Sequence, residues 1–242
     1  MKNILKFGLL ACLATAFVFA GCKKDDDDNN GDSGILPKKV SKIVETRVVD
    51  GESSDPYTSN FDTDGRLVSG GRSEKSVQYN YSDNAIEEIF NNKGKTTTSV
   101  YKVSDGRIVD LDGGKITYSS EGYLSLIDFD EFETEFTIID GKLTEMESRE
   151  SEDGKTYSTK YQFTNDNTLN NLNVDLSYFF LLEGICPGYF GKRLKYLPSS
   201  QIEVGGDNEI TKFTYTYDGD YLTKIIVQFD DNESLICEIF YY

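Results

Sequence analysis

The feature that most constrains the fold is a two-strand hairpin unit that the chain repeats, and residues 212–227 hold its clearest copy. Aromatic residues alternate there with lysine and threonine, which is the period-two pattern of a strand with one buried face. Asp218-Gly219 then predicts a tight hairpin turn, because both residue types tolerate positive φ angles. A second strand is expected from Tyr221. The residues that we expect in the core are Phe136, Phe213, Tyr215, Tyr217 and Leu222.

Weaker copies of this unit precede it, each with an apolar residue before the turn and an aliphatic residue after it. Their closing aliphatic residues lie 19, 22, 16, 19 and 26 positions apart, close to the length of two strands and two turns. Such self-similarity is typical of one supersecondary unit used repeatedly. The copies are Phe61–Leu67, Tyr81–Ile86, Val103–Ile108, Tyr118–Leu124, Ile138–Leu143 and Phe163–Leu169.

The repeats predict an all-β fold for residues 38–242, which we interpret as a single domain. Turn residues recur about every 8 to 12 positions, and we expect about 14 to 16 strands. A sheet of that length with one apolar face must close or fold over to hide the face. The sequence therefore predicts a many-stranded antiparallel meander that forms a barrel or a half-barrel.

One stretch, at about residues 170–204, interrupts the repeat. It is the most apolar part of the chain after the N-terminal segment, and Asp175 is a suitable N-cap for a short helix over residues 177–182. Pro187, Gly188, Gly191 and Pro198 indicate irregular backbone after that helix. Because a long apolar loop is unfavourable in water, we expect this insertion to plug one end of the sheet.

The first 21 residues are typical of a secretory signal peptide. Lys2 and Lys6 precede a charge-free, mostly apolar run that is too short for a permanent membrane span. Residues 18–22, Val-Phe-Ala-Gly-Cys, resemble the lipobox of bacterial lipoproteins. That resemblance implies that Cys22 is acylated and becomes the first residue of the mature protein.

Residues 22–37 are expected to be a disordered acidic tether. The segment 23–34 contains no apolar residue and has nothing to bury. A cysteine followed by lysine and an acidic run also resembles the surface-export signal of lipoproteins in the Bacteroidetes. A simple solvated spacer is the alternative interpretation.

Two parts of the insertion carry a more specific resemblance. Residues 172–179, Leu-Asn-Val-Asp-Leu-Ser-Tyr-Phe, and residues 188–200, Gly-Tyr-Phe-Gly-Lys-Arg-Leu-Lys-Tyr-Leu-Pro-Ser-Ser, resemble a family of Bacteroidetes lipoproteins of unknown function with a porin-like fold. The hairpin units are also similar to tyrosine-aspartate repeats. The resemblance implies an antiparallel barrel or half-barrel over residues 38–242, and it supplies no catalytic residues.

The composition excludes several kinds of catalytic site. The chain has no histidine and no tryptophan, which excludes Ser-His-Asp and Cys-His triads and imidazole zinc sites. Residues 60–67 resemble half of a calcium loop, but the frame lacks the bidentate glutamate at its last position, so a hairpin turn is the better interpretation. We therefore expect no metal, no cofactor and no enzymatic activity. A carboxylate-dependent glycan hydrolase remains an alternative, because the 42 acidic residues could hold a catalytic pair.

Two cysteines besides Cys22 remain in the mature chain, and two interpretations of them stay open. An exported protein permits a disulfide between Cys186 and Cys237. Cys237 also alternates with Leu235 and Ile239, which is the pattern of a small core residue.

The last residues, 240–242, resemble the aromatic terminus of outer-membrane barrels, so an integral barrel is a further alternative. A lipid-facing wall needs a continuous apolar band with aromatic residues at its two rims. Here the aromatic residues lie in mid-strand and the opposite faces carry lysine, glutamate and threonine. A water-soluble barrel on a lipid tether agrees better with this pattern.

Together these features predict a non-catalytic binding or scaffold module, anchored to the outer membrane by lipid and exposed on the cell surface. Removal of residues 1–21 leaves 23 basic and 42 acidic residues, which disfavours nucleic acid as a partner. A glycan or an outer-membrane protein is the expected partner. The alternative for the candidate ligand contacts is that they only seal the core. These contacts are Tyr178, Tyr189, Phe190, Lys192, Arg193 and Tyr196.

Overall fold

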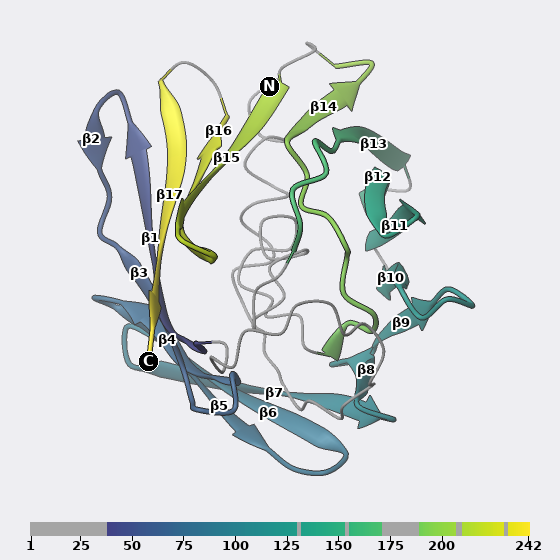
Figure 1. The fold of residues 1–242 in the computed structure, drawn as a ribbon. Helices are drawn as coiled ribbons and strands as arrows, with labels where there is room; N and C mark the ends of the chain where they lie inside the picture. Colours follow the sequence, from purple (N-terminus) through teal and green to yellow (C-terminus); the bar gives the residue numbers. More distant parts are fainter. Residues whose placement is uncertain (1–37, 130–131, 153–154, 171–188, 207–209, 230–231) are drawn as a thin grey trace, which may run out of the picture.

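The fold is an antiparallel β-barrel (Figure 1). The computed structural model describes residues 38–129, 132–152, 155–170, 189–206, 210–229 and 232–242. No helix in these ranges is long and apolar enough to cross a membrane. The strands are β1 (Val40–Val49), β2 (Glu52–Ser53), β3 (Tyr57–Phe61), β4 (Leu67–Arg72), β5 (Lys75–Tyr81), β6 (Ala85–Asn92), β7 (Lys95–Ser104), β8 (Arg107–Leu111), β9 (Gly114–Tyr118), β10 (Leu124–Phe129), β11 (Phe132–Ile139), β12 (Lys142–Glu152), β13 (Lys155–Thr164), β14 (Ser200–Val204), β15 (Ile210–Asp218), β16 (Tyr221–Gln228) and β17 (Glu233–Tyr241).

The barrel is closed by its first and last strands. β1 pairs with β17 along one edge and with β3 along the other, and every strand from β3 to β17 pairs with its neighbours in the chain. Sixteen strands form the ring, and the extra strand β2 pairs only with β1. Pro56, which has no N–H group to donate, lies between β2 and β3. The predicted barrel is confirmed, and it is a full barrel.

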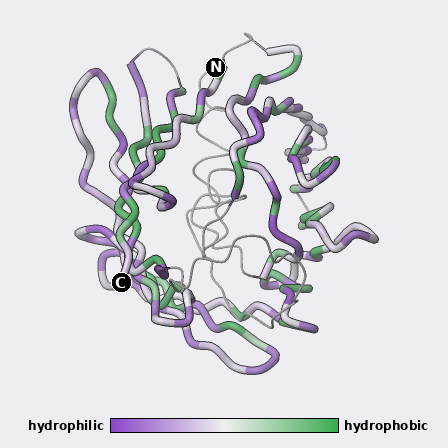
Figure 2. Tube along the Cα trace, in the orientation of Figure 1, coloured by the Kyte–Doolittle hydropathy of each residue, from purple (hydrophilic) through white to green (hydrophobic). Residues whose placement is uncertain are grey.

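The inward face of the ring is apolar. In β5, Val77 and Tyr79 are buried whereas Gln78 and Asn80 are exposed, as the two-residue period requires. Hydrophobic and hydrophilic residues succeed one another around the whole ring (Figure 2). The buried positions of the strands form one continuous hydrophobic cluster. Because only the inward face of a closed ring is enclosed, this cluster lies inside the barrel.

The six repeat turns that join consecutive strands lie at one end of the barrel, which we call the repeat rim. It is formed by the turns at residues 62–66, 82–84, 105–106, 119–123, 140–141 and 219–220. Each unit has two strands, so the chain returns to the same end after every unit. Asp105-Gly106 and Asp140-Gly141 have positive φ at both residues, as the Asp-Gly pattern predicts. At Asp218-Gly219 only the glycine has positive φ.

A hydrogen bond between successive repeats recurs along this rim. The hydroxyl groups of Tyr81 and Tyr118 donate to the carbonyl oxygens of Leu67 and Ile108, each at 2.6 Å. Each acceptor is the aliphatic residue that closes the preceding unit. The β3–β4 and β7–β8 pairings shift register next to these turns, which interrupts the regular ladder there. The tyrosine hydroxyl satisfies a backbone carbonyl at each interruption.

In these two units, an arginine that follows the turn glycine completes this contact. The guanidinium group of Arg66 lies 5.2 Å from the centre of the Tyr81 ring, and that of Arg107 lies 5.4 Å from the Tyr118 ring. One unit therefore supplies a cation to the ring and a carbonyl to the hydroxyl of the next tyrosine. This contact explains why Gly-Arg-aliphatic and Tyr recur together in the sequence.

We expect Tyr81→Phe to lower the free energy of unfolding by about 1 kcal/mol, because the Leu67 carbonyl loses its partner while the aromatic packing is kept. Urea unfolding of the purified protein measures the change. Tyr157→Phe is the control, since Tyr157 is exposed near the end of β13 away from the repeat rim and the substitution should leave stability unchanged. Equal effects of the two substitutions would contradict the role of the hydroxyl.

Residues 189–199, which we call the cap segment, lie inside the ring against the repeat rim (Figure 1). The backbone N–H groups of Lys192 and Lys195 donate to the carbonyls of Gly122 (2.7 Å) and Gly141 (2.8 Å) in two repeat turns. Phe190 is fully buried, so the segment also contributes to the core. For these residues the predicted plug is confirmed. The predicted helix over 177–182 lies outside the described residues.

Two details of the prediction are corrected. The irregular insertion ends at residue 199, before 204, because Ser200–Val204 is the ring strand β14. Tyr217 is not a core residue, since 38% of it is exposed. The β15–β16 pairing shifts register between Thr216 and Tyr217. This shift places the aromatic side chain of Tyr217 at the rim of the barrel, where the interior ends. The expected burial of Phe136, Phe213 and Leu222 is confirmed, and Tyr215 is partly buried with its hydroxyl donating to the Pro198 carbonyl at 2.6 Å.

Gly191 fixes how closely the cap segment approaches the rim. Its φ is +81°, and a Cβ atom there would collide with the Gly122 carbonyl oxygen and lie 2.8 Å from the Tyr118 ring. We expect Gly191→Ala to cost about 2–4 kcal/mol of stability, from the left-handed backbone and the collision together. Gly106→Ala is the matched control, because Gly106 also has positive φ but faces open space. Thermal unfolding should show a clearly smaller loss for the control, and equal losses would refute the collision.

Candidate functional site

The candidate contacts of the cap segment divide into two groups. Tyr189 and Phe190 are buried, Arg193 and Tyr196 are half-buried, and Lys192 is exposed. The first two therefore pack in the core, as the alternative interpretation expected, whereas Lys192 and Tyr196 form part of the cation-aromatic contacts of the rim. Tyr178 lies outside the described residues. A ligand bound by this set stays a prediction.

Tyr118 connects the buried part of the cap segment to the barrel wall. Its hydroxyl lies 2.6 Å from the Ile108 carbonyl oxygen and 3.1 Å from the Tyr189 carbonyl oxygen. Burial raises the pKa of Tyr118 well above its ordinary value of 10, although the charge of Arg107 opposes the shift. The hydroxyl therefore stays protonated and remains a donor at neutral pH. This contact joins the repeat motif to the cap segment.

The exposed part of the rim is a row of cations placed on aromatic rings. The Lys192 ammonium lies 4.9 Å from the centre of the Tyr123 ring. Tyr196 carries two ammonium groups, with Lys142 at 4.9 Å and Lys195 at 5.4 Å from its centre. Lysines held over rings lose part of their rotamer freedom but keep their N–H groups directed at solvent. The sequence analysis missed Arg107, Lys142 and Lys195. The available signals were that Arg107 and Lys142 each follow a turn glycine, and that Lys195 lies in the cap segment.

The cap segment is also electrostatically unusual for this chain. The whole protein has 42 acidic and 25 basic residues, yet residues 189–199 contain three basic residues and no acidic one. Glu121 and Asp140 lie in the adjoining turns. Within the described ranges, neither forms an ion pair with Arg107, Lys142, Lys192 or Lys195. In the described part of the chain, these four cations therefore have no carboxylate in direct contact.

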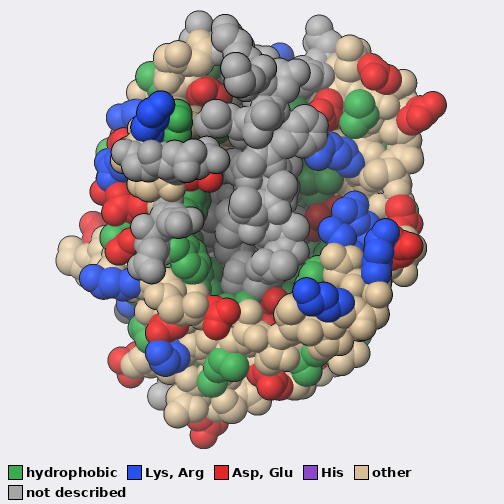
Figure 3. Space-filling view, turned by 180° about the vertical axis from the view of Figure 1, so that it is seen from behind, with side chains coloured by type: hydrophobic (Ala, Val, Ile, Leu, Met, Phe, Trp, Pro, Cys, Tyr) green, Lys and Arg blue, Asp and Glu red, His purple; other side chains and the backbone are tan. Residues whose placement is uncertain are grey.

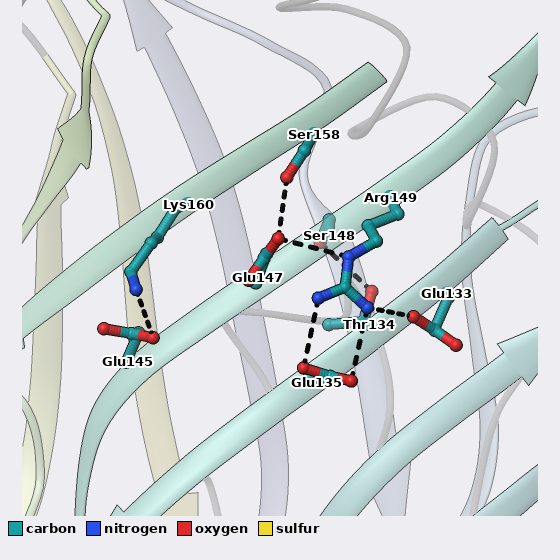
Figure 4. Close-up of polar contacts among 9 residues, drawn as sticks. All are labelled: Glu133, Thr134, Glu135, Glu145, Glu147, Ser148, Arg149, Ser158 and Lys160. Carbon is teal, nitrogen blue, oxygen red and sulfur yellow. Dashed lines mark hydrogen bonds and ion pairs between the residues drawn. The ribbon is translucent and has the colours of Figure 1, made fainter. Parts of the chain in front are cut away.

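The outer wall of β11, β12 and β13 carries a separate charged network (Figure 4). The guanidinium group of Arg149 is surrounded by the carboxylates of Glu133, Glu135 (3.2 Å) and Glu147 (3.1 Å). A hydrogen bond from Ser158 and the charge of Arg149 hold the pKa of Glu147 below its ordinary value of 4.5. Glu147 is therefore ionised at neutral pH, which does not suit a general acid. The neighbouring Lys160 pairs with Glu145 at 2.6 Å.

In contrast to these outer-wall glutamates, Glu88 faces the barrel interior. Only 2% of the residue is exposed, and its Oε2 atom has no hydrogen-bonding partner among the described residues. Burial raises the pKa of Glu88 from 4.5 to about 7, although the hydroxyl groups of Tyr101 and Tyr79 favour the ionised form. The surrounding strands close this group off from solvent, so a substrate cannot reach it through the wall.

Cys237 faces the same interior. It lies opposite Glu45 of β1 and Ile225 of β16, and burial raises the pKa of its thiol well above 9. This placement agrees with the interpretation of a small core residue. A disulfide with Cys186 stays a prediction, because Cys186 lies outside the described residues. Within the described ranges no cluster of His, Cys, Asp or Glu could hold a metal ion. In the turn that resembled a calcium loop, Asp62 instead pairs with Arg66 at 2.7 Å.

Comparison with solved structures identifies the architecture. Two porin-like proteins are similar to this chain, one from Bacteroides vulgatus (TM-score 0.61, 12% identity) and one from Bacteroides uniformis (TM-score 0.55, 16% identity). Each alignment covers 85% of this chain and 99% of the other. The fold is a porin-like barrel. No family model and no curated protein matches the sequence. The porin-like fold that the sequence resemblance implied is thus confirmed, while membership in the lipoprotein family stays a prediction.

Glu88 makes the stability of this porin-like barrel depend on pH. Between pH 4.5 and 7 the unfolded state has lost the proton that the folded state keeps, so the free energy of unfolding falls as pH rises. Below pH 4.5 Glu88 is protonated in both the folded and the unfolded state, so its burial no longer lowers the free energy of unfolding. Above pH 7 this lowering is fully present, at about 3 kcal/mol.

We expect Glu88→Gln to be more stable than the native protein at pH 8 and equally stable at pH 4. Urea unfolding across this range gives the difference between the two proteins at each pH. Glu87→Gln is the control, because Glu87 lies on the outward face of the same strand and bonds to Asn80. The argument would be contradicted if the free energies of unfolding of the native protein and of Glu88→Gln differed by the same amount at every pH.

Proposed function

We propose that the mature chain is a lipoprotein anchored at the outer membrane through Cys22, exposed on the cell surface, and acting as a non-catalytic binding or scaffold module. The observation that carries this proposal is the polarity of the barrel, which is apolar inside and charged outside. A barrel of that kind is stable in water. It needs an anchor to stay at a membrane, and the lipobox-like segment supplies one.

The same polarity disfavours an integral barrel and a channel. A lipid-facing wall requires an apolar band, whereas Glu133, Glu135 and Arg149 lie on the outer wall of neighbouring strands. Acidic and basic side chains are also scattered over the described part of the face seen in Figure 3. A water-filled channel requires polar inward positions, and most of the buried inward positions here belong to the hydrophobic core. "Porin-like" describes the neighbours, and only the fold is carried over.

A glycan hydrolase finds less support than a binding module. The carboxylates around Arg149 are held in ion pairs, and Glu88 is closed off from solvent. Neither arrangement offers a raised-pKa acid and a second carboxylate on opposite sides of an accessible bond, as glycoside hydrolysis requires. The repeat rim instead offers exposed cations on a rigid support. That arrangement suits binding, with a glycan or an outer-membrane protein as the partner class.

The anchor would attach at the end of the barrel that carries the cap segment. The described chain begins there, where the Lys39 ammonium donates to the Thr63 carbonyl at 2.5 Å and the Tyr242 N–H donates to the Lys39 carbonyl at 3.0 Å. Residues 22–37 would hold this end within about 50 Å of the membrane when fully extended.

We expect Cys22→Ala to move the protein from the membrane fraction to the soluble fraction, because the acyl chains that provide stable attachment are lost. Cell fractionation and labelling with a radioactive fatty acid measure the two effects. Cys237→Ala is the control, since that buried thiol should not affect either result. Retention of the Cys22 variant in membranes would refute the anchor.

Two further measurements address the rest of the proposal. Protease added to intact cells should remove the barrel if it is exposed, and full protection would refute the surface location. A glycan screen that follows both retention and cleavage separates binding from turnover. Cleavage that is lost on replacement of one carboxylate would refute the non-catalytic role.

A further inference from the structure

We propose that the row of cations at the repeat rim, which consists of Arg107, Lys142, Lys192 and Lys195, binds a linear polysaccharide that carries sulfate or carboxylate groups. This inference rests on the proposed binding function and assigns its ligand class and site. The four residues come from two repeat turns and the cap segment, so the site exists only in the folded barrel. It lies on the surface beside the buried Tyr189 and Phe190 and does not use them.

The four cations form one continuous strip. The Arg107 guanidinium lies over the Tyr118 ring. Its terminal nitrogen would be 3.2 Å from a Cβ atom placed on Gly122, so the two residues are neighbours. The Gly122 carbonyl in turn accepts a hydrogen bond from the Lys192 N–H. Gly141 lies between Lys195 and Tyr123. A Cβ atom placed on Gly141 would collide with the Lys195 side chain and lie 3.2 Å from the Tyr123 hydroxyl oxygen.

The far end of the strip is fixed by one aromatic ring. Lys142 and Lys195 both lie over Tyr196, so their ammonium groups are within about 10 Å of each other. That spacing is close to the Debye length at physiological salt, so the two charges reinforce each other at a ligand. Lys142 is further oriented by donating to the Asn167 side chain at 2.7 Å.

These cations are available to a ligand in a way that others in the protein are not. Arg149 is saturated by three glutamates, and Arg66 is paired with Asp62 and Asp64. Arg107, Lys192 and Lys195 are exposed, and the structure gives them aromatic contacts but no ion pair within the described ranges. A bound anion would therefore gain their charge without first breaking an ion pair.

The rest of the same rim favours a narrow ligand over a flat one. Asp62, Asp64, Asp218 and Asp220 lie in the other turns of the rim, whereas Asp105, Glu121 and Asp140 lie in the turns beside the strip. An anionic membrane surface pressed on this end would meet all of these acidic residues as well as the cations. A single linear chain could follow the cationic strip and avoid the four aspartates of the other turns. Charge complementarity thus selects a polyanion about one chain wide.

The remaining chemistry favours an acidic sugar chain over a peptide or a neutral glycan. Extended peptides bind by adding a strand to a sheet edge, and the closed ring leaves its sixteen strands without such an edge. Neutral sugars bind by stacking on open aromatic faces, but Tyr118, Tyr123 and Tyr196 already carry cations. Sulfate and carboxylate groups are the natural acceptors for guanidinium and ammonium donors.

The test measures binding of dextran sulfate to the detergent-solubilised full-length protein at low salt, with uncharged dextran as the reference. Lys192→Gln combined with Lys195→Gln should weaken binding about tenfold and flatten its salt dependence, because two charge contacts are removed. Lys95→Gln combined with Lys115→Gln is the control, which makes the same change in net charge at the opposite rim and should alter binding less than about twofold. Arg107→Gln supplies a second variant at the other end of the strip.

Several results would overturn the proposal. These are a failure of dextran sulfate to bind, equal weakening by the control pair, and equal binding of uncharged dextran. Equally strong binding of polyaspartate or of phosphatidylglycerol vesicles would replace the sugar with an acidic peptide or a membrane. Circular dichroism and thermal unfolding of each variant show that the fold is kept. Because the assay uses solubilised protein, its outcome is independent of whether Cys22 anchors the chain.

Discussion

The pairing of β1 with β17 is the interaction on which the rest of the structure depends. Each hairpin presents one apolar face, and no single hairpin can hide that face from water. Closure between the first and last strands turns all these faces inward at once, so they form one core. The charged outer wall, the buried Glu88 and the rim all follow from this closure. It also joins the two ends of the described chain at the repeat rim, where Tyr242 bonds to Lys39.

The cation-aromatic contacts serve two purposes in this barrel. At Tyr81 and Tyr118 the arginine of one unit stabilises the tyrosine of the next, and the tyrosine hydroxyl satisfies a carbonyl where the ladder is interrupted. At Tyr123 and Tyr196 the same type of contact orients lysines that point to solvent. A repeated structural contact thus supplies the support for a surface on which a ligand can bind. The charge of that surface contrasts with the acidic character of the chain.

Much of the fold could be predicted from the sequence because its determinants are local. The alternation in β15 and the Asp-Gly turns act within about 20 residues, so hairpins, their period and the barrel class were all visible in advance. Tyr217 failed as a core residue because a register shift beside the turn moves it to the rim. The sequence left open whether Tyr189 and Phe190 contact a ligand or seal the core, because their burial depends on strands far away in the chain.

The sequence by itself determined that this protein is built from repeated hairpins with one apolar face, since side-chain period and turn chemistry are properties of neighbouring residues. It also indicated that the insertion at about residues 170–204 would plug one end of the sheet. Only the tertiary structure decided that the sheet closes, that Glu88 is sealed inside, and that Arg107 lies in one strip with Lys142 and Lys192. The physical reason is that closure and charge clustering depend on contacts between residues distant in the chain, and a pattern along the sequence does not encode which distant turns will meet.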